Sequence, residues 1–167
     1  MPIQRTGHVA IRVRDLEAAK RFYGDVLGMK LGGEIPGQGL FFRFSDYHHD
    51  IAVFKADDDA EPASKKHAGI AHIALVADNF ETVRNMYRRL REHNVPIVRT
   101  IDHGATKSVY FTDPDGIELE IYCDVPEFDW RGRGMVRELF DIENESAAEP
   151  LMGVSPSRAW KGPADNP

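Results

Sequence analysis

Residues 107–122, KSVYFTDPDGIELEIY, contain the pattern that decides the fold. Two runs of alternating apolar and polar residues flank a Pro-Asp-Gly turn, which predicts a β-hairpin. Because side chains alternate along a strand, Ile117, Leu119 and Ile121 share one face, while Glu118 and Glu120 lie on the other. A carboxylate in the middle of a strand is either solvated or a ligand that points into a cavity. The rest of the chain decides between these two interpretations.

Length and composition indicate a soluble globular protein with one core. The chain has 167 residues, of which 42% are hydrophobic and 29% are charged. Its net charge of -6, without a long basic run, argues against a nucleic-acid partner. No apolar run approaches the roughly 18 residues of a membrane span. The N-terminal residues lack the apolar core of a signal peptide and Cys123 is the single cysteine, so we expect a cytoplasmic protein.

One supersecondary unit is expected to occur twice in the chain, each time as a strand, a helix and three further strands (βαβββ). Apolar residues recur at helical spacing in two segments, and strand-like alternation surrounds both. The expected elements of the first copy are 7–14, 16–27, 29–34, 40–45 and 50–55, and those of the second copy are 71–76, 79–93, 95–101, 108–112 and 117–123. Asp78 followed by Glu81 has the spacing of a capping box for the second helix.

The predicted fold class is therefore α+β, with two tandem βαβββ modules that form a cupped mixed sheet around a central metal site. The two modules are residues 5–56 and 69–124, joined by a polar linker over 57–68. Together they make a domain over 1–124. Residues 125–167 follow as a C-terminal extension. We expect a loop over 130–134 and a short helix over 135–142 in this extension.

Two histidines at matched positions supply partners for Glu120. His8 and His72 are the second residues of the opening strands in the two copies and lie 64 positions apart. Equivalent positions of related modules are expected to surround a shared cavity. Two imidazoles and one carboxylate make the facial triad that suits non-haem Fe(II), or alternatively Mn(II). Glu118 has no such partners and is expected to be a solvated strand end.

The repeated unit, with GHVAIRV (7–13), AHIALV (71–76) and YFTDPDGIELEIY (110–122), resembles the vicinal oxygen chelate superfamily. That superfamily includes glyoxalase I, fosfomycin-resistance transferases, bleomycin-resistance proteins and type I extradiol dioxygenases. The resemblance implies that His8, His72 and Glu120 bind a metal ion. Ala52 aligns with Glu120 at the position where glyoxalase I carries a fourth ligand, and alanine cannot coordinate a metal.

Three further residues match single-domain type I extradiol dioxygenases. His49, within HDIA (49–52), resembles the acid–base histidine of these enzymes, and Tyr110 resembles the tyrosine that hydrogen-bonds the bound catecholate. His103 lies in the loop where they place a histidine near the substrate oxygens. The resemblance implies Fe(II)-dependent cleavage of a catechol-type ring, with a small aromatic diol and O2 as substrates and a homodimer or larger homo-oligomer as the assembly.

Two other functions remain open. A Mn(II)-dependent, fosfomycin-resistance-like thiol transferase would share the three ligands and Tyr110, but it requires a cationic cluster, for which Lys107 and Arg99 are the nearby candidates. A non-catalytic protein that sequesters a small aromatic ligand would use the same cavity. For an aromatic ligand, the residues expected to line the cavity are Phe42, Phe44, Ile51 and Phe111.

Overall fold

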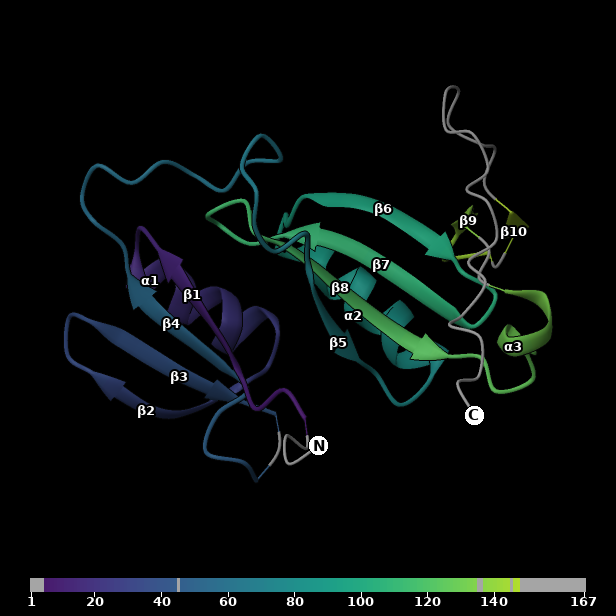
Figure 1. Cartoon of the computed structure of the whole chain (residues 1–167), viewed down its shortest axis with the longest axis horizontal. Coiled ribbons are helices and arrows are strands. Elements are labelled where there is room, and N and C mark those ends of the chain that lie inside the picture. Colours follow the sequence, from purple (N-terminus) through teal and green to yellow (C-terminus); the bar gives the residue numbers. More distant parts are fainter. Residues whose placement is uncertain (1–4, 45, 135–136, 145, 148–167) are drawn as a thin grey trace, which may run out of the picture. The chain divides into compact units, whose positions relative to one another are not determined.

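The computed structural model describes residues 5–44, 46–134, 137–144 and 146–147 (Figure 1). They form two compact units. The first contains the residues up to Gly69 together with Asp113–Ile117, and the second contains Ile70–Thr112 and the residues from Glu118 onward. Each unit has one mixed β-sheet, which confirms the α+β class. None of the helices in the described ranges combines the length and the apolar character needed to cross a bilayer.

The sheet of the first unit has the strand order β1-β4-β3-β2. Its strands are β1 (Val9–Val13), β2 (Lys30–Ile35), β3 (Gly39–Arg43) and β4 (Ile51–Lys55). β1 pairs with β4 in parallel and the other neighbours are antiparallel. The parallel pair requires a crossover connection, and the helical segment after β1 begins it.

The helical segment of the first unit comprises α1 (Leu16–Ala19) and the π-helical η1 (Lys20–Val26). The Asp15 carboxylate caps it by accepting the backbone N–H groups of Glu17 and Ala18. Ala19, Phe22, Tyr23 and Val26 are buried on one side of it, and the ring centroids of Tyr23 and Phe42 lie 5.6 Å apart. Gly28 follows with φ 74°, as expected for the residue after a helix.

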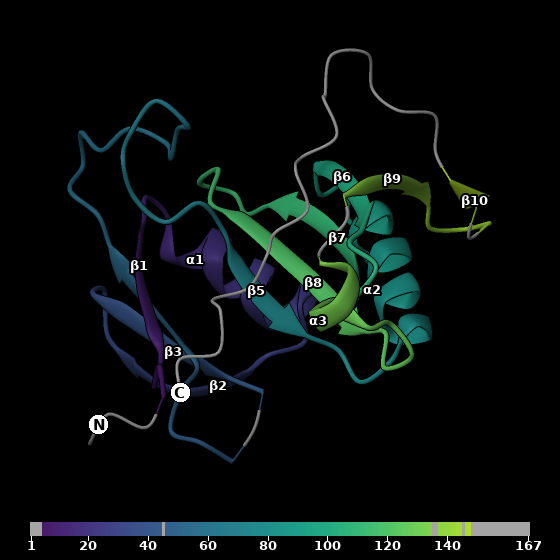
Figure 2. The same cartoon turned by 45° about the vertical axis from the view of Figure 1, so that its right-hand side comes forward.

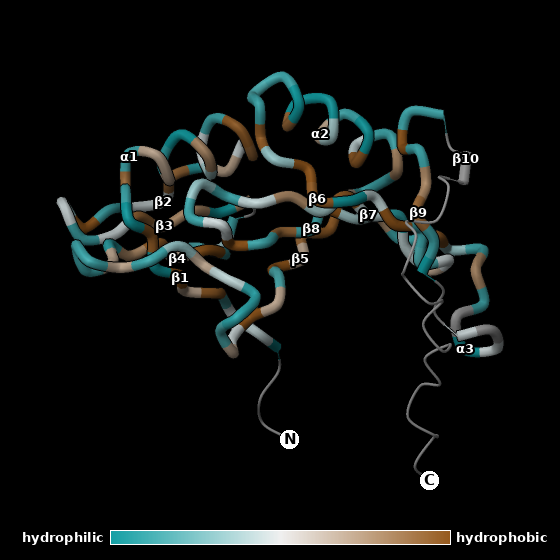
Figure 3. Tube along the Cα trace, turned by 90° about the horizontal axis from the view of Figure 1, so that it is seen from above, coloured by the Kyte–Doolittle hydropathy of each residue, from teal (hydrophilic) through white to brown (hydrophobic). Residues whose placement is uncertain are grey.

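The sheet of the second unit has the strand order β10-β9-β6-β7-β8-β5. Its strands are β5 (Ile73–Val76), β6 (Ile97–Asp102), β7 (Thr106–Thr112), β8 (Glu118–Asp124), β9 (Glu138–Asp141) and β10 (Ser146–Ala147). α2 (Phe80–Glu92) lies along one face of β7 and β8 (Figure 3). Val83 and Leu90 are the fully buried residues of α2. The opposite face of this sheet carries His72, Tyr110 and Glu120.

The two units repeat the same strand register. In the first unit Ala10 pairs with Ala52, and in the second Ala74 pairs with Glu120. Ala52 and Glu120 therefore occupy equivalent positions, and the alignment of the two copies is confirmed. In each unit these residues point away from the face that carries the helix.

The helix cap predicted at Asp78 is wrong. Asn79 is the N-cap of α2, and its side chain accepts the backbone N–H of Thr82. Asp78 instead accepts the side-chain hydroxyl of Thr82 at 2.6 Å. Asp and Asn are equally good N-caps, so the sequence alone does not choose between the two adjacent residues, and the extended backbone of Asn79 marks it as the cap.

The secondary structure predicted for the C-terminal extension is also wrong. Trp130–Arg133 form the short helix α3 rather than a loop, and Glu138–Asp141 form strand β9 rather than part of a helix. β9 pairs with the edge of β6, with Leu139 opposite Ile101 (Figure 2). Pairing with this edge satisfies backbone groups that a local helix would leave unpaired on β6. Residues 135–136 of the predicted helix and the final stretch 148–167 lie outside the described residues.

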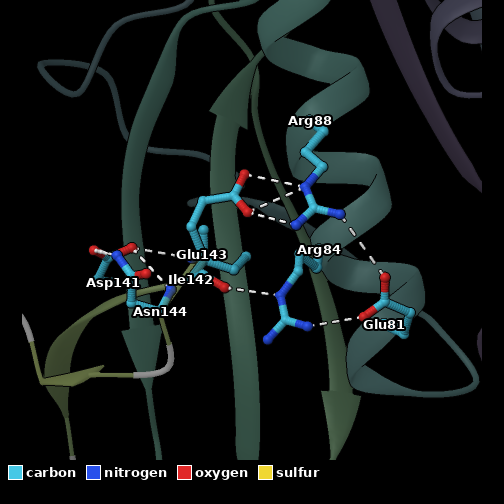
Figure 4. Close-up of polar contacts among 7 residues, drawn as sticks. All are labelled: Glu81, Arg84, Arg88, Asp141, Ile142, Glu143 and Asn144. Atoms are coloured by element: carbon cyan, nitrogen blue, oxygen red, sulfur yellow. Dashed lines mark hydrogen bonds and ion pairs between the residues drawn. The ribbon is translucent and has the colours of Figure 1, made fainter.

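Arginines of α2 hold the segment after β9 (Figure 4). Arg88 contacts the carboxylate of Glu143 through two nitrogens, the shorter contact being 2.6 Å. Arg84 donates to the backbone carbonyl of Ile142 at 3.1 Å and pairs with Glu81 of its own helix at 2.8 Å. Residues 138–143 are thus anchored both to the sheet and to α2.

The turn of the predicted hairpin, Asp113–Ile117, belongs to the first unit. The Tyr23 hydroxyl donates to Asp113 at 2.9 Å, and Arg14 pairs with Asp115 at 2.7 Å. Asp113 also accepts the backbone N–H groups of Asp115 and Ile117. Burial raises the pKa of the Asp113 carboxyl above its ordinary value, although these donors oppose the shift.

Candidate metal and substrate site

His72 and Glu120 form a pair of potential metal ligands in the second unit. His72 immediately precedes β5, Glu120 lies in the middle of β8, and the two strands are parallel neighbours. The His72 Nε2 and Glu120 Oε2 atoms lie 3.1 Å apart. Two adjacent ligands of an octahedral ion, with bonds of about 2.1 Å, lie about 3.0 Å apart. The spacing of the two atoms therefore matches that of two adjacent coordination positions.

Tyr110 lies beside this pair. It sits in β7 directly opposite Glu120, and the rings of Tyr110 and His72 meet edge to face with centroids 5.5 Å apart. Burial raises the pKa of the Tyr110 phenol well above its ordinary range, and a hydrogen bond to the Glu120 carboxylate adds to the rise. The phenol therefore keeps its proton, which it donates to the Glu120 carboxylate.

His103 reaches the same group of residues. It follows β6 in the loop before β7, and its Nε2 atom lies 3.0 Å from the Tyr110 hydroxyl. The loop is a tight turn, in which the backbone N–H of His103 donates to the backbone carbonyl of Thr106 at 2.8 Å. The structure thus brings together four residues that the sequence singled out separately: His72, His103, Tyr110 and Glu120.

The expectation that Glu118 is a solvated strand end is wrong. Its carboxylate pairs with the Arg99 guanidinium at 2.5 Å, and the side chains of Glu118 and Arg99 are only 10% and 18% exposed. The Arg99 guanidinium also stacks on the Tyr110 ring, 3.9 Å from its centroid. Opposite charges on one face of β6 and β8, the two strands that flank β7, were the available signal, but a bulge between Ile97 and Arg99 hides their register.

In the first unit, His49 lies next to His8. The two ring centroids are 4.3 Å apart, and Phe41 contacts the His49 ring at 5.2 Å. The Nδ1 atoms of His48 and His49 lie 2.6 Å apart, so one ring donates to the other. Desolvation lowers the pKa of His49, and the neighbouring His8 and His48 lower it further. The predicted acid–base histidine therefore adjoins a predicted metal ligand.

The complete triad remains a prediction. In neither unit do three or more His, Cys, Asp or Glu side chains, among the residues that the structure describes, form a group able to hold a metal ion. His8 belongs to the first unit, whereas His72 and Glu120 belong to the second. What the structure gives is two partial sites, His8 with His49 and His72 with Glu120.

Other residues predicted around the site have different environments. Phe42, Ile51 and Phe111 are fully buried in the core, whereas the Phe44 side chain is exposed to solvent. The parity of their strands directs the three buried side chains away from the face with the candidate ligands. The Lys107 amino group lies 4.7 Å from the Phe80 ring centroid, on the side of the sheet that α2 covers. The cavity-lining assignments of Phe42, Ile51 and Phe111 are therefore wrong.

The sequence also matches a known family. Residues 5–121 match the family described as the Glyoxalase/Bleomycin resistance protein/Dioxygenase superfamily. The chain belongs to this superfamily. Its structure agrees with that of a superfamily domain from Frankia sp. EAN1pec, with a TM-score of 0.65 and 19% identity over 74% of this chain and 99% of that domain.

Relatives within the superfamily have different reactions. The chain is 32% identical over 118 residues to biphenyl-2,3-diol 1,2-dioxygenase 2 of Rhodococcus globerulus, a match that covers 70% of this chain and 61% of the relative. It is 30% identical over 122 residues to metallothiol transferase FosB of Staphylococcus saprophyticus, covering 72% and 77% of the two proteins. The chain thus spans about three fifths of the length of the dioxygenase relative.

Proposed function

We propose that this protein is an Fe(II)-dependent extradiol dioxygenase that opens a catechol-type ring beside its two hydroxyl groups and inserts both atoms of O2. The observation that carries the proposal is the array on the second sheet. The His103–Tyr110 hydrogen bond of 3.0 Å lies beside the His72–Glu120 pair at 3.1 Å. Hydrogen-bonding groups for a bound diol thus adjoin donors for the metal. The relationship to biphenyl-2,3-diol 1,2-dioxygenase 2 supports the same choice.

The proposed metal ligands are His8, His72 and Glu120. Their donor set of two imidazoles and one carboxylate suits Fe(II), and it would also accept Mn(II). When bound, the metal would supply a template that collects the two diol oxygens and O2 in one coordination sphere. Ala52 stands at the position equivalent to Glu120 and leaves the ligand set at three.

The remaining residues of the proposed site handle protons and orient the diol. Tyr110, which keeps its proton, would donate it to a substrate oxygen in place of Glu120 when that carboxylate binds the metal. His103 fixes the direction of the Tyr110 hydroxyl and approaches the same oxygens. His49, whose pKa is lowered, is neutral at physiological pH, so it can take a proton from the diol and later return it to the product.

A Mn(II)-dependent thiol transferase is the second candidate, because the FosB relative is 30% identical and the metal ligands would be the same. Neither of the two cations expected to bind its anionic substrate is free for that role. Lys107 lies on the α2 side of the sheet, and Arg99 is paired with Glu118. The structure therefore favours the dioxygenase over the transferase.

The test is to load the purified protein anaerobically with Fe(II) and add catechol, 3-methylcatechol or 2,3-dihydroxybiphenyl together with O2. We expect one O2 consumed per diol and the yellow absorbance of a ring-opened product. A Glu120→Gln variant should lose both signals, whereas Leu31→Ala, a change at an exposed residue of β2, should keep them. Absence of O2 uptake with every diol would refute the proposal.

The same samples separate the alternatives. Formation of a fosfomycin–thiol adduct by the Mn(II)-loaded protein would support the transferase, and tight diol binding without metal would support a non-catalytic binding protein. The proposal also includes a cytoplasmic homodimer or larger homo-oligomer. Light scattering measures the assembly, and a monomer would contradict that part.

A further inference from the structure

The loop that carries His103 has a tight backbone conformation. Residues 103–105 connect β6 to β7, and Gly104 has φ 75°, in the left-handed region that favours glycine. The Gly104 N–H donates to the Asp102 carboxylate at 2.7 Å. This bond holds the middle of the loop and does not involve the His103 ring.

An aromatic residue of the C-terminal extension closes against this loop. A Cβ atom placed on Gly104 would meet the Cε2 and Cζ atoms of the Phe128 ring at 2.5 Å, and Cδ2 at 3.0 Å. The Phe128 ring therefore packs directly on the Gly104 backbone. The absence of a side chain at Gly104 is what allows the ring to come so close.

Phe128 is itself held in place. The Val125 N–H donates to the carbonyl of Ala105 at 2.8 Å, and the Phe128 N–H donates to the carbonyl of Val125 at 3.0 Å. The first of these bonds ties the extension to the loop, and the second closes the turn that returns Phe128 to Gly104. The Phe128 side chain is half-buried.

We propose that Phe128 is a positioning residue for His103: its ring, packed on Gly104, holds the 103–105 loop so that the His103 imidazole meets the Tyr110 hydroxyl. The inference rests on the proposed function for its catalytic consequence. It makes the start of the C-terminal extension part of the site rather than an appendage. The Phe128 ring positions His103 through the backbone of Gly104 and does not contact the substrate.

The decisive experiment compares Phe128→Ala with the parent in the full chain, loaded with Fe(II). We expect kcat/KM for catechol to fall roughly tenfold, because misplacement of a hydrogen-bonding group weakens orientation of the substrate. In a His103→Asn background the same substitution should change kcat/KM by less than about twofold, since the two residues act as one unit. Phe128→Leu, which keeps an apolar contact, should recover most of the loss. Additive effects of Phe128→Ala and His103→Asn would overturn the inference.

A second measurement does not depend on activity. The imidazole resonances of His103 can be assigned by their loss in His103→Asn, and they should shift in Phe128→Ala but not in the control Leu31→Ala. Gly104→Ala adds a methyl group where the Phe128 ring lies, so it should shift the His103 resonances as well. It therefore provides a second test if Phe128→Ala folds poorly. Unchanged resonances in both variants would refute the positioning role. If the parent consumes no O2 while the resonances shift, the proposed function fails and the positioning role stands.

Discussion

Replacing Arg99 by methionine should destabilise the fold far more than loss of an ordinary surface ion pair. The Arg99→Met variant leaves the Glu118 carboxylate, only 10% exposed, without the cation that contacts it at 2.5 Å. Breaking one partner of a buried pair costs about 3–5 kcal/mol. Arg99 is 18% exposed, so some solvent screening remains and the lower end, about 3 kcal/mol, applies. Loss of the stacking on Tyr110 adds about 0.5–1 kcal/mol.

The assay is urea denaturation followed by circular dichroism, with a second probe to check that the transitions coincide. With a slope of about 2 kcal/mol per molar urea, the summed loss of about 3.5–4 kcal/mol lowers the midpoint by about 1.8–2 M. The double variant Arg99→Met/Glu118→Met removes both charges, so its loss of unfolding free energy should be about 1 kcal/mol or less. Its recovery relative to the single variant measures the coupling between the two side chains.

The matched control is Lys20→Met. Lys20 and Glu34 form an ion pair of 3.6 Å with side chains 44% and 49% exposed, and such pairs contribute about 0–1 kcal/mol. Two results would refute the reasoning: an Arg99→Met loss no larger than that of Lys20→Met, or a double variant as unstable as the single one. Either would mean that the Arg99–Glu118 pair is solvated in solution.

Three further predictions concern the hairpin turn and the metal. Tyr23→Phe removes a donor from buried Asp113, so urea denaturation should show a loss of about 1–2 kcal/mol, and no change would contradict the role of this bond. The pKa of Asp113 is raised above 3.8, so its contribution to stability is complete below that pH and is lost as the pH rises through the raised value. A carbon-13 NMR titration of Asp113 checks the direction, and a midpoint below 3.8 would reverse the sign. Glu120→Gln should weaken Fe(II) or Mn(II) binding at least tenfold by calorimetry, roughly 1.4 kcal/mol, and unaltered affinity would exclude Glu120 as a ligand.

Local patterns predicted much of the fold and part of the site. Strand alternation placed Glu120 on the face away from the helix, and the repeat correctly aligned it with Ala52. Tyr110 and His103 were assigned by family resemblance, and the structure brings them within hydrogen-bonding distance. The placement of Glu120 depends on strand alternation and on the repeat, both of which a single sequence displays, whereas Tyr110 and His103 depend on the family resemblance.

The errors arise where distant segments compete with local preference. β9 forms because the edge of β6 is available to it. The sequence of residues 135–142 contains no signal for pairing with that edge. Glu118 is half-buried and paired with Arg99 because a bulge in β6 brings Arg99 opposite Tyr110, and the position of a bulge is not visible in an alternating pattern. The distance from His8 to the second-unit donors is likewise a tertiary property, so the triad remains a prediction.

The hairpin turn has a consequence for how the chain can be divided and how it folds. The contacts from Tyr23 to Asp113 and from Arg14 to Asp115 span 90 and 101 residues. A fragment that ends at Gly69 would contain every strand of the first sheet, yet it would leave the buried Tyr23 hydroxyl without its acceptor. The repeat in the sequence therefore does not mark two separable folding units. Contacts of such long range slow folding, and the first unit can be complete only after the second hairpin has been synthesised.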